Sequence, residues 1–491
     1  MNPIDTGLVW LRRDLRLHDH AAIALALAHC RQLQLAFVFD TAILAPLPRA
    51  DRRVAFIRET LAQTDGRLRE RAGRAGCGLI TGHGPAVDEI VRIARAVGAQ
   101  AVFASHDDEP ASLARDAAAR EALAAHGIAL HTVKDHLVFE RRELLTRTGT
   151  PYTVFTPYAR VWRASLAPAD WAPRDTAALP ERLAERPPAL RRDVPTLAEI
   201  GFTTPPTAPP DGAQLPAPGP AGARAALKAF LPRLDTYDQL RDLPAEDATS
   251  RLGIHLRFGT LSIRELFALA QQRLEAKNTP SPEGTLAWLN ELIWREFFAQ
   301  IMANFPHAMS GAFRPAYDAI AWETGPRADA HFAAWCQGRT GYPIVDAAMR
   351  QLAATGFMPG RLRMVTASFL IKDLGLDWRR GEAWFAEKLD DFDLAANNGN
   401  WQWVASTGCD AQPWFRVFNP VLQSRKFDPE AVYIRRWLPE LARLPARLLH
   451  DMRRAGPQER AGLAYPEPVV DHEAARGRTL LRYGAAARAT A

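Results

Sequence analysis

The chain has 491 residues, of which 47 % are hydrophobic, so it can form roughly two to four domains with sizeable cores. Its four cysteines stand far apart without a C-x-x-C pair, which disfavours structural disulfides, zinc and iron–sulfur clusters, so no metal site is expected. No run of about 18 or more apolar residues and no charged segment followed by an apolar core is present, so we expect no membrane span, no signal peptide and a cytoplasmic location. The net charge of +6 comes mostly from arginine, which suits phosphate but equally fits a genome rich in arginine codons.

From residue 7 to about 135, short apolar runs alternate with helical patterns. The runs at 7–10, 33–39 and 101–104 are typical of strands buried on both faces, and the alanine-rich segments 51–75 and 86–97 of helices. This alternation predicts an α/β domain with a doubly wound parallel sheet. No G-x-G-x-x-G follows the first strand, so a standard dinucleotide site is not expected there.

Proline clusters mark the next part of the chain. Between about 165 and 222 they include Pro187-Pro188, Pro205-Pro206 and Pro209-Pro210, and proline at this density favours an extended connector. Beyond it, strand patterns are scarce and helical periodicity recurs. The helical patterns lie at 285–303, 344–354, 362–374 and 381–389. The sequence therefore predicts an α/β domain over 1–135, an interdomain linker over 136–222 and an all-helical domain over 223–483.

The densest chemistry lies at 391–403, where carboxylates, side-chain amides and two indoles fall within one short stretch. Indole is easily oxidised and stacks on flat rings, so this segment indicates a redox or stacking site. Taken alone, its carboxylates would equally cap a helix or face solvent, and its indoles would equally pack a core.

Four motifs together resemble the DNA photolyases and cryptochromes, and most closely the bacterial class I repairers of cyclobutane pyrimidine dimers. They lie in the same order as in that family, at 9–16, 249–252, 288–297 and 391–403, and the match runs from Val9 to about Ala474. The resemblance implies an all-α FAD-binding domain after the α/β domain. It also implies light-driven repair of pyrimidine dimers in damaged DNA by electron transfer from reduced FAD, in a protein that acts as a monomer and lyase.

The same resemblance implies an FAD site. The segment 249–253 matches the family's grip on the FAD pyrophosphate, Arg363 and Asp391 match a pair beside the isoalloxazine, and Asn397 matches the residue facing flavin N5. The full set expected to bind FAD is Tyr237, Thr249, Ser250, Arg251, Leu252, Gly253, Trp288, Arg295, Arg363, Asp391, Phe392, Asp393 and Asn397. One departure is Gly253, where the family often has serine.

Three tryptophans match the family's electron relay, which leads from the surface to the photoexcited flavin. Trp335, Trp378 and Trp401 are expected to conduct in that order. Without the resemblance, three indoles in a helical core would be ordinary packing.

A lesion pocket is implied because a dimer inside a duplex reaches a buried flavin only when it is flipped out. By resemblance Trp294 and Trp403 form its walls, Glu291 reads the pyrimidine edge and stabilises charge on it, and Met364 adds an adaptable apolar contact. The positions expected to hold the DNA around this pocket are Arg241, Gly360, Arg361, Arg416 and Gln423.

Two features depart from the family. Pro359 and Gly360 stand where an imidazole and an amide are usual, so lesion affinity and lesion type stay open and a cryptochrome-like photoreceptor is the alternative function. Repair of the (6-4) photoproduct is disfavoured, because that activity uses a His-His pair at these positions. Ala111 and Ser112 replace the Asn-Glu pair that holds a methenyltetrahydrofolate antenna, so folate, another second chromophore and none remain open.

Overall fold

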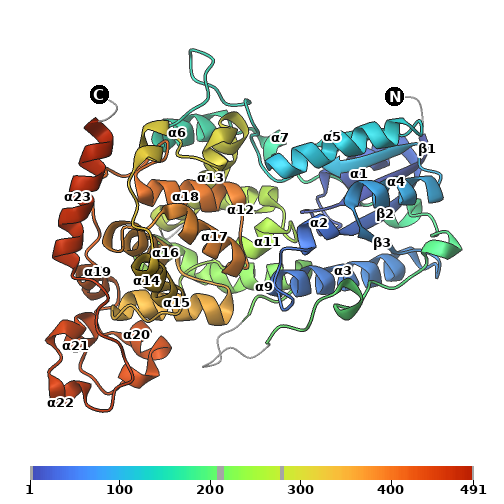
Figure 1. Cartoon of the computed structure of the whole chain (residues 1–491). Coiled ribbons are helices and arrows are strands. Elements are labelled where there is room, and N and C mark those ends of the chain that lie inside the picture. Colours follow the sequence, from blue (N-terminus) through green and yellow to red (C-terminus); the bar gives the residue numbers. More distant parts are fainter. Residues whose placement is uncertain (1–3, 207–214, 277–280, 489–491) are drawn as a thin grey trace.

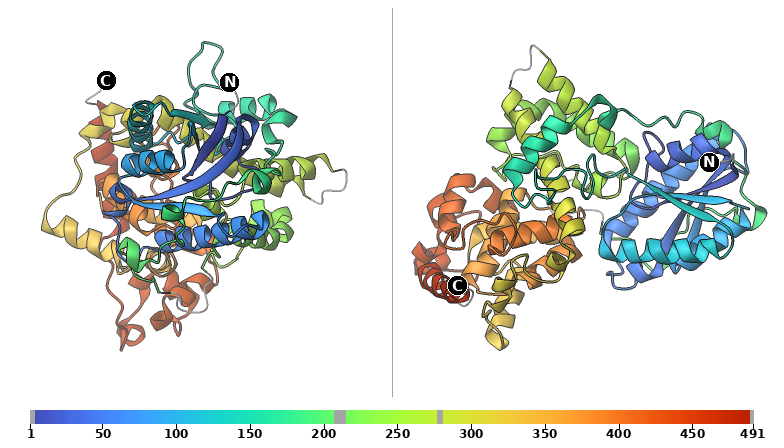
Figure 2. Two further views of the ribbon diagram at one scale, coloured as in Figure 1. Left: turned by 90° about the vertical axis from the view of Figure 1, so that its right-hand side faces the viewer. Right: turned by 90° about the horizontal axis from the view of Figure 1, so that it is seen from above.

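The computed structural model describes residues 4–206, 215–276 and 281–488. An α/β domain lies beside a larger helical domain, and the two chain ends lie at opposite sides of the molecule (Figure 1). Viewed from above, the domains form two lobes joined by extended chain (Figure 2). Within the described ranges, no helix has the length and apolar character needed to cross a bilayer.

The α/β domain is built on five parallel strands in the order β3-β2-β1-β4-β5. The strands are β1 (Ile4–Leu11), β2 (Cys30–Asp40), β3 (Leu79–Gly84), β4 (Ala101–Ser105) and β5 (Ala129–Val133). The three predicted apolar runs lie in β1, β2 and β4. Strands β3 and β5 carry no continuous apolar run and were not predicted, because two glycines interrupt β3 and a histidine and a threonine interrupt β5.

Helices cover both faces of this sheet, as predicted. They are α1 (Ala21–His29), α2 (Thr41–Leu44), α3 (Arg52–Ala72), α4 (Ala86–Ala96) and α5 (Pro110–Ala124). Alternate β1 side chains enter different cores: Val9 packs with residues of α1 and α3, and Trp10 packs with residues of α4 and α5. This alternation is the period-2 pattern of a strand buried on both faces.

The connecting segment contains more structure than the predicted extended linker. Its elements are α6 (Phe155–Ser165), α7 (Pro168–Trp171), α8 (Leu179–Arg182), η1 (Pro188–Leu190) and η2 (Ala198–Ile200). Tyr158 and Trp162 of α6 are buried in the core of the helical domain. Buried Glu296 holds the same region, because its carboxylate accepts from Val138 N–H at 2.6 Å and from Trp162 Nε1–H at 2.5 Å.

The second half of the connecting segment packs against a different domain from the first half. Leu183 and Ile200 pack into the core of the α/β domain, so the two halves belong to different domains. Pro209 and Pro210 of the predicted proline-rich connector lie outside the described residues.

The described part of the chain from residue 219 onward is helical, and every strand of the sheet precedes it. The first half holds α9 (Gly219–Phe230), η4 (Leu231–Thr236), α10 (Tyr237–Leu240), α11 (Gly253–Arg257), α12 (Ile263–Glu275), α13 (Pro282–Asn304), η5 (Pro306–Met309), η6 (Pro315–Ala319), α14 (Pro326–Cys336), α15 (Pro343–Thr355) and α16 (Gly360–Ser368). The second half holds η7 (Phe369–Asp373), α17 (Trp378–Lys388), α18 (Leu394–Ala405), α19 (Pro420–Phe427), α20 (Val432–Trp437), η8 (Pro439–Leu441), α21 (Ala446–His450), η9 (Met452–Arg454), α22 (Pro457–Arg460) and α23 (His472–Arg488). The four predicted helical patterns correspond to α13, α15, α16 with η7, and α17.

Close helix packing around α18 depends on two glycines. A Cβ at Gly381 of α17 would overlap the ring of Trp401, and a Cβ at Gly399 of α18 would overlap the ring of Phe298 on α13. Both glycines therefore allow α18 to lie directly against its neighbours, which positions the face that carries Asn397 and Trp401.

Candidate functional site

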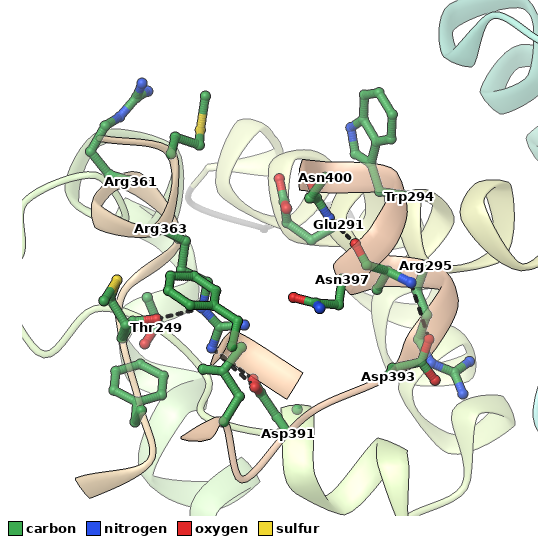
Figure 3. Close-up of a pocket in the computed structure, with 18 of the residues that line it drawn as sticks. Thr249, Glu291, Trp294, Arg295, Arg361, Arg363, Asp391, Asp393, Asn397 and Asn400 are labelled. Atoms are coloured by element: carbon green, nitrogen blue, oxygen red, sulfur yellow. Dashed lines mark hydrogen bonds and ion pairs between the residues drawn. The ribbon is translucent and has the colours of Figure 1, made fainter. Parts of the chain in front are cut away.

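A cavity of about 630 Å³ opens in the helical domain (Figure 3). Its walls come from α10 and the segment that leads to α11, from α13 and α16, and from residues 389–404 around the start of α18. Segments as far apart in sequence as Tyr237 and Val404 therefore meet around one space.

This cavity gathers most of the predicted site. The predicted FAD residues that line it are Tyr237, Thr249, Ser250, Arg251, Leu252, Gly253, Arg295, Arg363, Asp391, Phe392, Asp393 and Asn397. The predicted relay, lesion and DNA residues that line it are Arg241, Glu291, Trp294, Gly360, Arg361, Met364, Trp401 and Trp403.

An ion pair stands on one side of the cavity. Arg363 Nη2 lies 2.9 Å from Asp391 Oδ2 and 3.1 Å from Asp391 Oδ1, and Arg363 Nε donates to the carbonyl of Met358 at 2.8 Å. The guanidinium is therefore fixed by both the carboxylate and the backbone. A Cβ at Gly253 would lie only 2.5 Å from Asp391 Oδ2, so the serine usual in the family would crowd this carboxylate.

The loop before α11 adopts a conformation that is rare for a side-chain-bearing residue. Arg251 has φ of 52°, and its guanidinium lies 4.8 Å from the centre of the Phe357 ring. Since α11 has only five residues, its dipole is short, and an anion there would depend on individual N–H groups and hydroxyls.

Asn397 points toward the centre of the cavity (Figure 3). Its Nδ2 donates to the carbonyl of Glu382 at 3.0 Å and to Glu382 Oε1 at 3.1 Å. Both partners are acceptors, so the amide nitrogen must face Glu382, and the amide oxygen is left to accept a hydrogen bond on the cavity side. Burial raises the pKa of Glu382, and the hydrogen bond from Asn397 opposes this shift.

Asp393 caps the helix that carries these side chains. Its Oδ1 accepts from the N–H of Ala396 at 3.2 Å, which satisfies a free donor in the first turn of α18. Its Oδ2 accepts from Arg13 Nη2 at 2.6 Å, although Arg13 lies in the α/β domain. Burial acts to raise the pKa of Asp393, but Arg13, Arg257 and Arg295 outweigh it and hold this pKa well below its usual range.

The opposite side of the cavity is aromatic and charged. The Trp294 ring stacks on Phe155 with centroids 3.6 Å apart and an angle of 4° between planes, and the Phe298 centroid is 5.3 Å away. Glu291 and Arg241 form an ion pair. Burial raises the pKa of Glu291, and Arg241 opposes this shift. On the side of Arg363, Arg361 Nη2 lies 2.6 Å from Asp242 Oδ2 (Figure 3).

Five predicted site residues do not line the cavity. Trp288 is buried in the core, with its ring 5.5 Å from Phe230, and the other four are Trp335, Trp378, Arg416 and Gln423. Arg416 is exposed and Gln423 is half-buried.

The predicted relay needs a correction at its outer end. Trp335 is 0 % exposed, so this side chain does not reach the surface as the family's outermost indole does. Its ring centroid lies 6.2 Å from that of Trp401, and the Phe385 ring lies 5.9 Å from Trp335 and 5.0 Å from Trp401. Trp335 is therefore a direct neighbour of Trp401 rather than the far end of a line through Trp378.

Several residues in or next to the site were not predicted from the sequence. Phe155 lies in the predicted linker, and Arg13 belongs to a motif that carried the resemblance but received no role. The missed residues that line the cavity itself are Asp242, Phe298, Phe357, Met358, Ala367, Phe385, Leu389, Ala396, Asn400 and Val404. Helical periodicity could have placed Phe385 on the buried face of α17, but sequence carries no signal for the stacking of Phe155.

In the α/β domain, the two positions that bind folate in the resembling family are occupied by residues with other contacts. Ser112 Oγ donates to Asp107 Oδ2 at 3.0 Å and receives a hydrogen bond from Arg115 at 3.1 Å, while Ala111 is exposed. The Glu109 carboxylate is bound by Arg13 and Arg257. Among the described residues, no group of three His, Cys, Asp or Glu side chains could hold a metal ion.

Comparisons with known proteins point to one family. A family described as "DNA photolyase" matches residues 7–181, and one described as "FAD binding domain of DNA photolyase" matches residues 288–485. The curated deoxyribodipyrimidine photo-lyase of Synechococcus sp. is 38 % identical over 470 residues, which cover 95 % of this chain and 93 % of the relative.

Solved structures give the same result. A bacterial class III photolyase from Agrobacterium tumefaciens superposes with a TM-score of 0.86 and 33 % identity, covering 99 % of this chain and 98 % of that one. A cryptochrome from Synechocystis sp. superposes with a TM-score of 0.77 and 25 % identity, covering 98 % of this chain and 100 % of that one. The chain belongs to the DNA photolyase family, with an α/β photolyase domain and a helical FAD-binding domain.

Proposed function

We propose that this protein is a deoxyribodipyrimidine photo-lyase, which uses FAD and blue light to split cyclobutane pyrimidine dimers in DNA. The observation that supports the proposal is that one cavity is lined both by residues suited to a flavin and by residues suited to a flipped pyrimidine dimer. The Arg363–Asp391 pair and Asn397 line one side, while Trp294, Trp403, Glu291 and Met364 line another. A photoreceptor would need the first set but has no need of a pocket for a flipped dimer.

The residues present fit FAD. The fixed Arg363 guanidinium, the amide oxygen of Asn397 and the hydroxyls of Thr249 and Ser250 offer the donors and acceptors that a flavin ring and a pyrophosphate require. The cavity volume of about 630 Å³ lies in the range of cofactor pockets. The chemistry that FAD supplies when bound is a light-driven transfer of one electron from the reduced flavin to the dimer, which opens the cyclobutane ring and returns the electron.

The chain's own side chains orient the lesion. Trp294 and Trp403 give the flipped bases aromatic surfaces and exclude water, and the stacked Phe155 supports the Trp294 ring from behind. Glu291 reads the edge of a pyrimidine. Burial raises the pKa of Glu291, and this shift grows when DNA phosphate draws Arg241 away, because Arg241 opposes it.

Arginines hold the backbone of the DNA around the cavity. Arg241 and Arg361 stand at its rim, and exposed Arg416 lies outside it. Guanidinium groups at these places bind phosphate without reading sequence, which suits an enzyme that recognises damage. We propose that the protein acts as a cytoplasmic monomer that associates with the nucleoid through these contacts.

Electron supply from the surface is proposed to end at Trp401, which lines the cavity, and to include Trp378. Trp322 is a candidate for the outer end. It is half-buried rather than fully buried, and the next residue, Glu323, donates its N–H to the carbonyl of Gly375, three residues before Trp378.

A repair assay tests the proposed function. Purified protein with fully reduced FAD should split cyclobutane dimers in an oligonucleotide under blue light and leave (6-4) photoproducts intact. Absence of dimer splitting at saturating light would favour the photoreceptor function. Repair of the (6-4) product would show that Pro359 and Gly360 had altered the lesion type.

A further inference from the structure

The cavity is connected to the α/β domain through one arginine. Arg13 follows β1 at its carboxyl end, where the strand order reverses between β1 and β4. Its Nη1 lies 3.2 Å from Asp107 Oδ1 and 2.8 Å from Glu109 Oε1, both of which follow β4. Its Nη2 lies 2.6 Å from Asp393 Oδ2 in the helical domain. Ligands of open α/β sheets bind at such a reversal, but here an arginine of the chain reaches out from it to the other domain.

A second arginine, Arg257, also contacts acidic residues of both domains. Arg257 of α11 binds the same Glu109 and lies 3.4 Å from Asp393 Oδ2. The side chains of Arg13, Arg257, Glu109 and Asp393 are between 14 % and 19 % exposed, so water screens their charges weakly. Burial alone would lower the pKa of Arg13, but Asp107, Glu109 and Asp393 raise it above its usual range, so Arg13 stays charged.

The charges in this cluster balance. Arg13, Arg257 and Arg295 face Asp107, Glu109 and Asp393, which gives three positive and three negative charges. Removal of one side chain therefore leaves one uncompensated charge of known sign. Because Asp393 and Arg295 line the cavity, that charge is felt by a ring bound there.

Asp393 gives the cluster a direct structural link to the site. One oxygen of its carboxylate caps α18, and the other binds Arg13. Helix α18 carries Asn397 and Trp401 on its cavity face. The α/β domain thus holds the start of the helix that lines the cavity.

We propose that Arg13 is a positioning residue through which the α/β domain sets the reduction potential of the flavin, by fixing Asp393 and neutralising its charge. The inference rests on the proposed place of FAD in the cavity. Reduction of flavin takes up two electrons and one proton, so at neutral pH the reduced ring carries one more negative charge than the oxidised ring. Extra negative charge at Asp393 therefore disfavours the reduced form.

Two substitutions by uncharged glutamine, which change the net charge of the cluster in opposite directions, test the proposal. Arg13→Gln leaves the cluster with one extra negative charge, so the midpoint potential of bound FAD shifts to more negative values. Glu109→Gln leaves one extra positive charge, so the potential shifts to more positive values. A unit charge about 10 Å away at an effective dielectric constant of about 20 changes the ratio of oxidised to reduced FAD on the order of tenfold. Arg13→Lys keeps the charge, and its potential stays near that of the wild type.

The measurement is a reductive titration of FAD-loaded protein against a dye of known potential, with thermal unfolding of each variant as the control for folding. Opposite shifts for Arg13→Gln and Glu109→Gln support the proposal, whereas shifts in the same direction, or none, overturn it. If Arg13→Gln does not fold, a positive shift in Glu109→Gln with an unshifted Arg13→Lys supports the proposal, and any other pattern overturns it. The titration needs no DNA, so its failure is distinct from a failure of dimer repair by wild-type protein.

Discussion

Arg241 is ion-paired with Glu291, so the residue proposed to bind phosphate and the residue proposed to read the base edge neutralise each other. Both side chains are about one third to one half exposed, and a pair of this kind contributes only about 0–1 kcal/mol. DNA phosphate can therefore displace Glu291 from Arg241 at little cost, and the two proposed roles become available together.

DNA affinity should depend on these arginines without regard to damage. Arg241→Ala and Arg416→Ala should weaken binding to damaged and undamaged DNA about equally, and each should reduce the salt dependence of binding by roughly one unit, because each removes one phosphate contact. Fluorescence anisotropy over a series of salt concentrations measures both quantities. Arg120→Ala, at an exposed position on α5, is the matched control and should change neither. A loss confined to damaged DNA would contradict a phosphate role.

Preference for damage should depend on Trp294. Trp294→Ala removes an aromatic surface for the flipped bases and should lose about 1–3 kcal/mol of binding to damaged DNA, while undamaged DNA binds as before. Competition binding with matched oligonucleotides measures the ratio. Phe155→Ala should reduce the same ratio by less, since it frees the Trp294 ring without removing it. Full discrimination by Trp294→Ala would refute the stacking role.

The rate of FAD photoreduction should show which tryptophans belong to the electron relay. Trp401→Phe and Trp378→Phe should nearly abolish the reduction of oxidised FAD under blue light with an external reductant, because phenylalanine is much harder to oxidise. Trp322→Phe should slow it, whereas Trp335→Phe should have a smaller effect, since Trp335 is 0 % exposed. Repair by chemically reduced protein should persist in all four variants. Unchanged photoreduction in Trp401→Phe would remove this residue from the relay.

The variant Gly360→Asn restores the amide that is usual in the family and tests whether its absence weakens lesion binding. Gly360 is the first residue of α16, and a Cβ there would meet nothing within 4 Å, so Gly360→Asn fits without a clash. If the glycine only lacks a lesion contact, the variant should bind dimer-containing DNA more tightly by about 1 kcal/mol, the value of one net hydrogen bond. Binding assays with and without the lesion measure this gain. An equal gain for undamaged DNA would mean that the amide binds backbone rather than lesion.

Lys372 should make stability depend on pH. It is 0 % exposed, and burial lowers its pKa to about 7 from the ordinary value of 10.5. Between these two values the unfolded chain binds more protons at this site than the folded protein does, so the free energy of unfolding should rise with pH across the window. Lys372→Met should reduce that slope by up to about 1.4 kcal/mol per pH unit. Denaturant unfolding between pH 7 and 10 measures it, with the partly exposed Lys388→Met as control, and parallel curves for wild type and Lys372→Met would contradict the assignment.

Sequence predicted the fold and most of the cavity because local motifs carry that information. The buried strands β1, β2 and β4 have continuous apolar runs, and the stretch 391–403 forms one turn and one helix whose residues stay together in any fold. The bond from Arg13 to Asp393 spans 380 positions, and nothing local to either residue indicates the other. The burial of Trp335 likewise depends on α17 and α18 packing around it, which periodicity alone does not determine.

The early position of α6 in the chain has a consequence for synthesis. Trp162 and Tyr158 pack against Phe297 and its neighbours on α13, about 135 residues later in the chain. A ribosome adds about 5–20 residues per second, so for roughly 7–27 seconds the apolar face of α6 lacks its partner α13. During the same interval the chain also completes the α/β domain, whose core takes in Leu183 and Ile200 from the segment after α6. Chaperone dependence of the nascent chain should therefore peak between the completion of α6 and the emergence of α13.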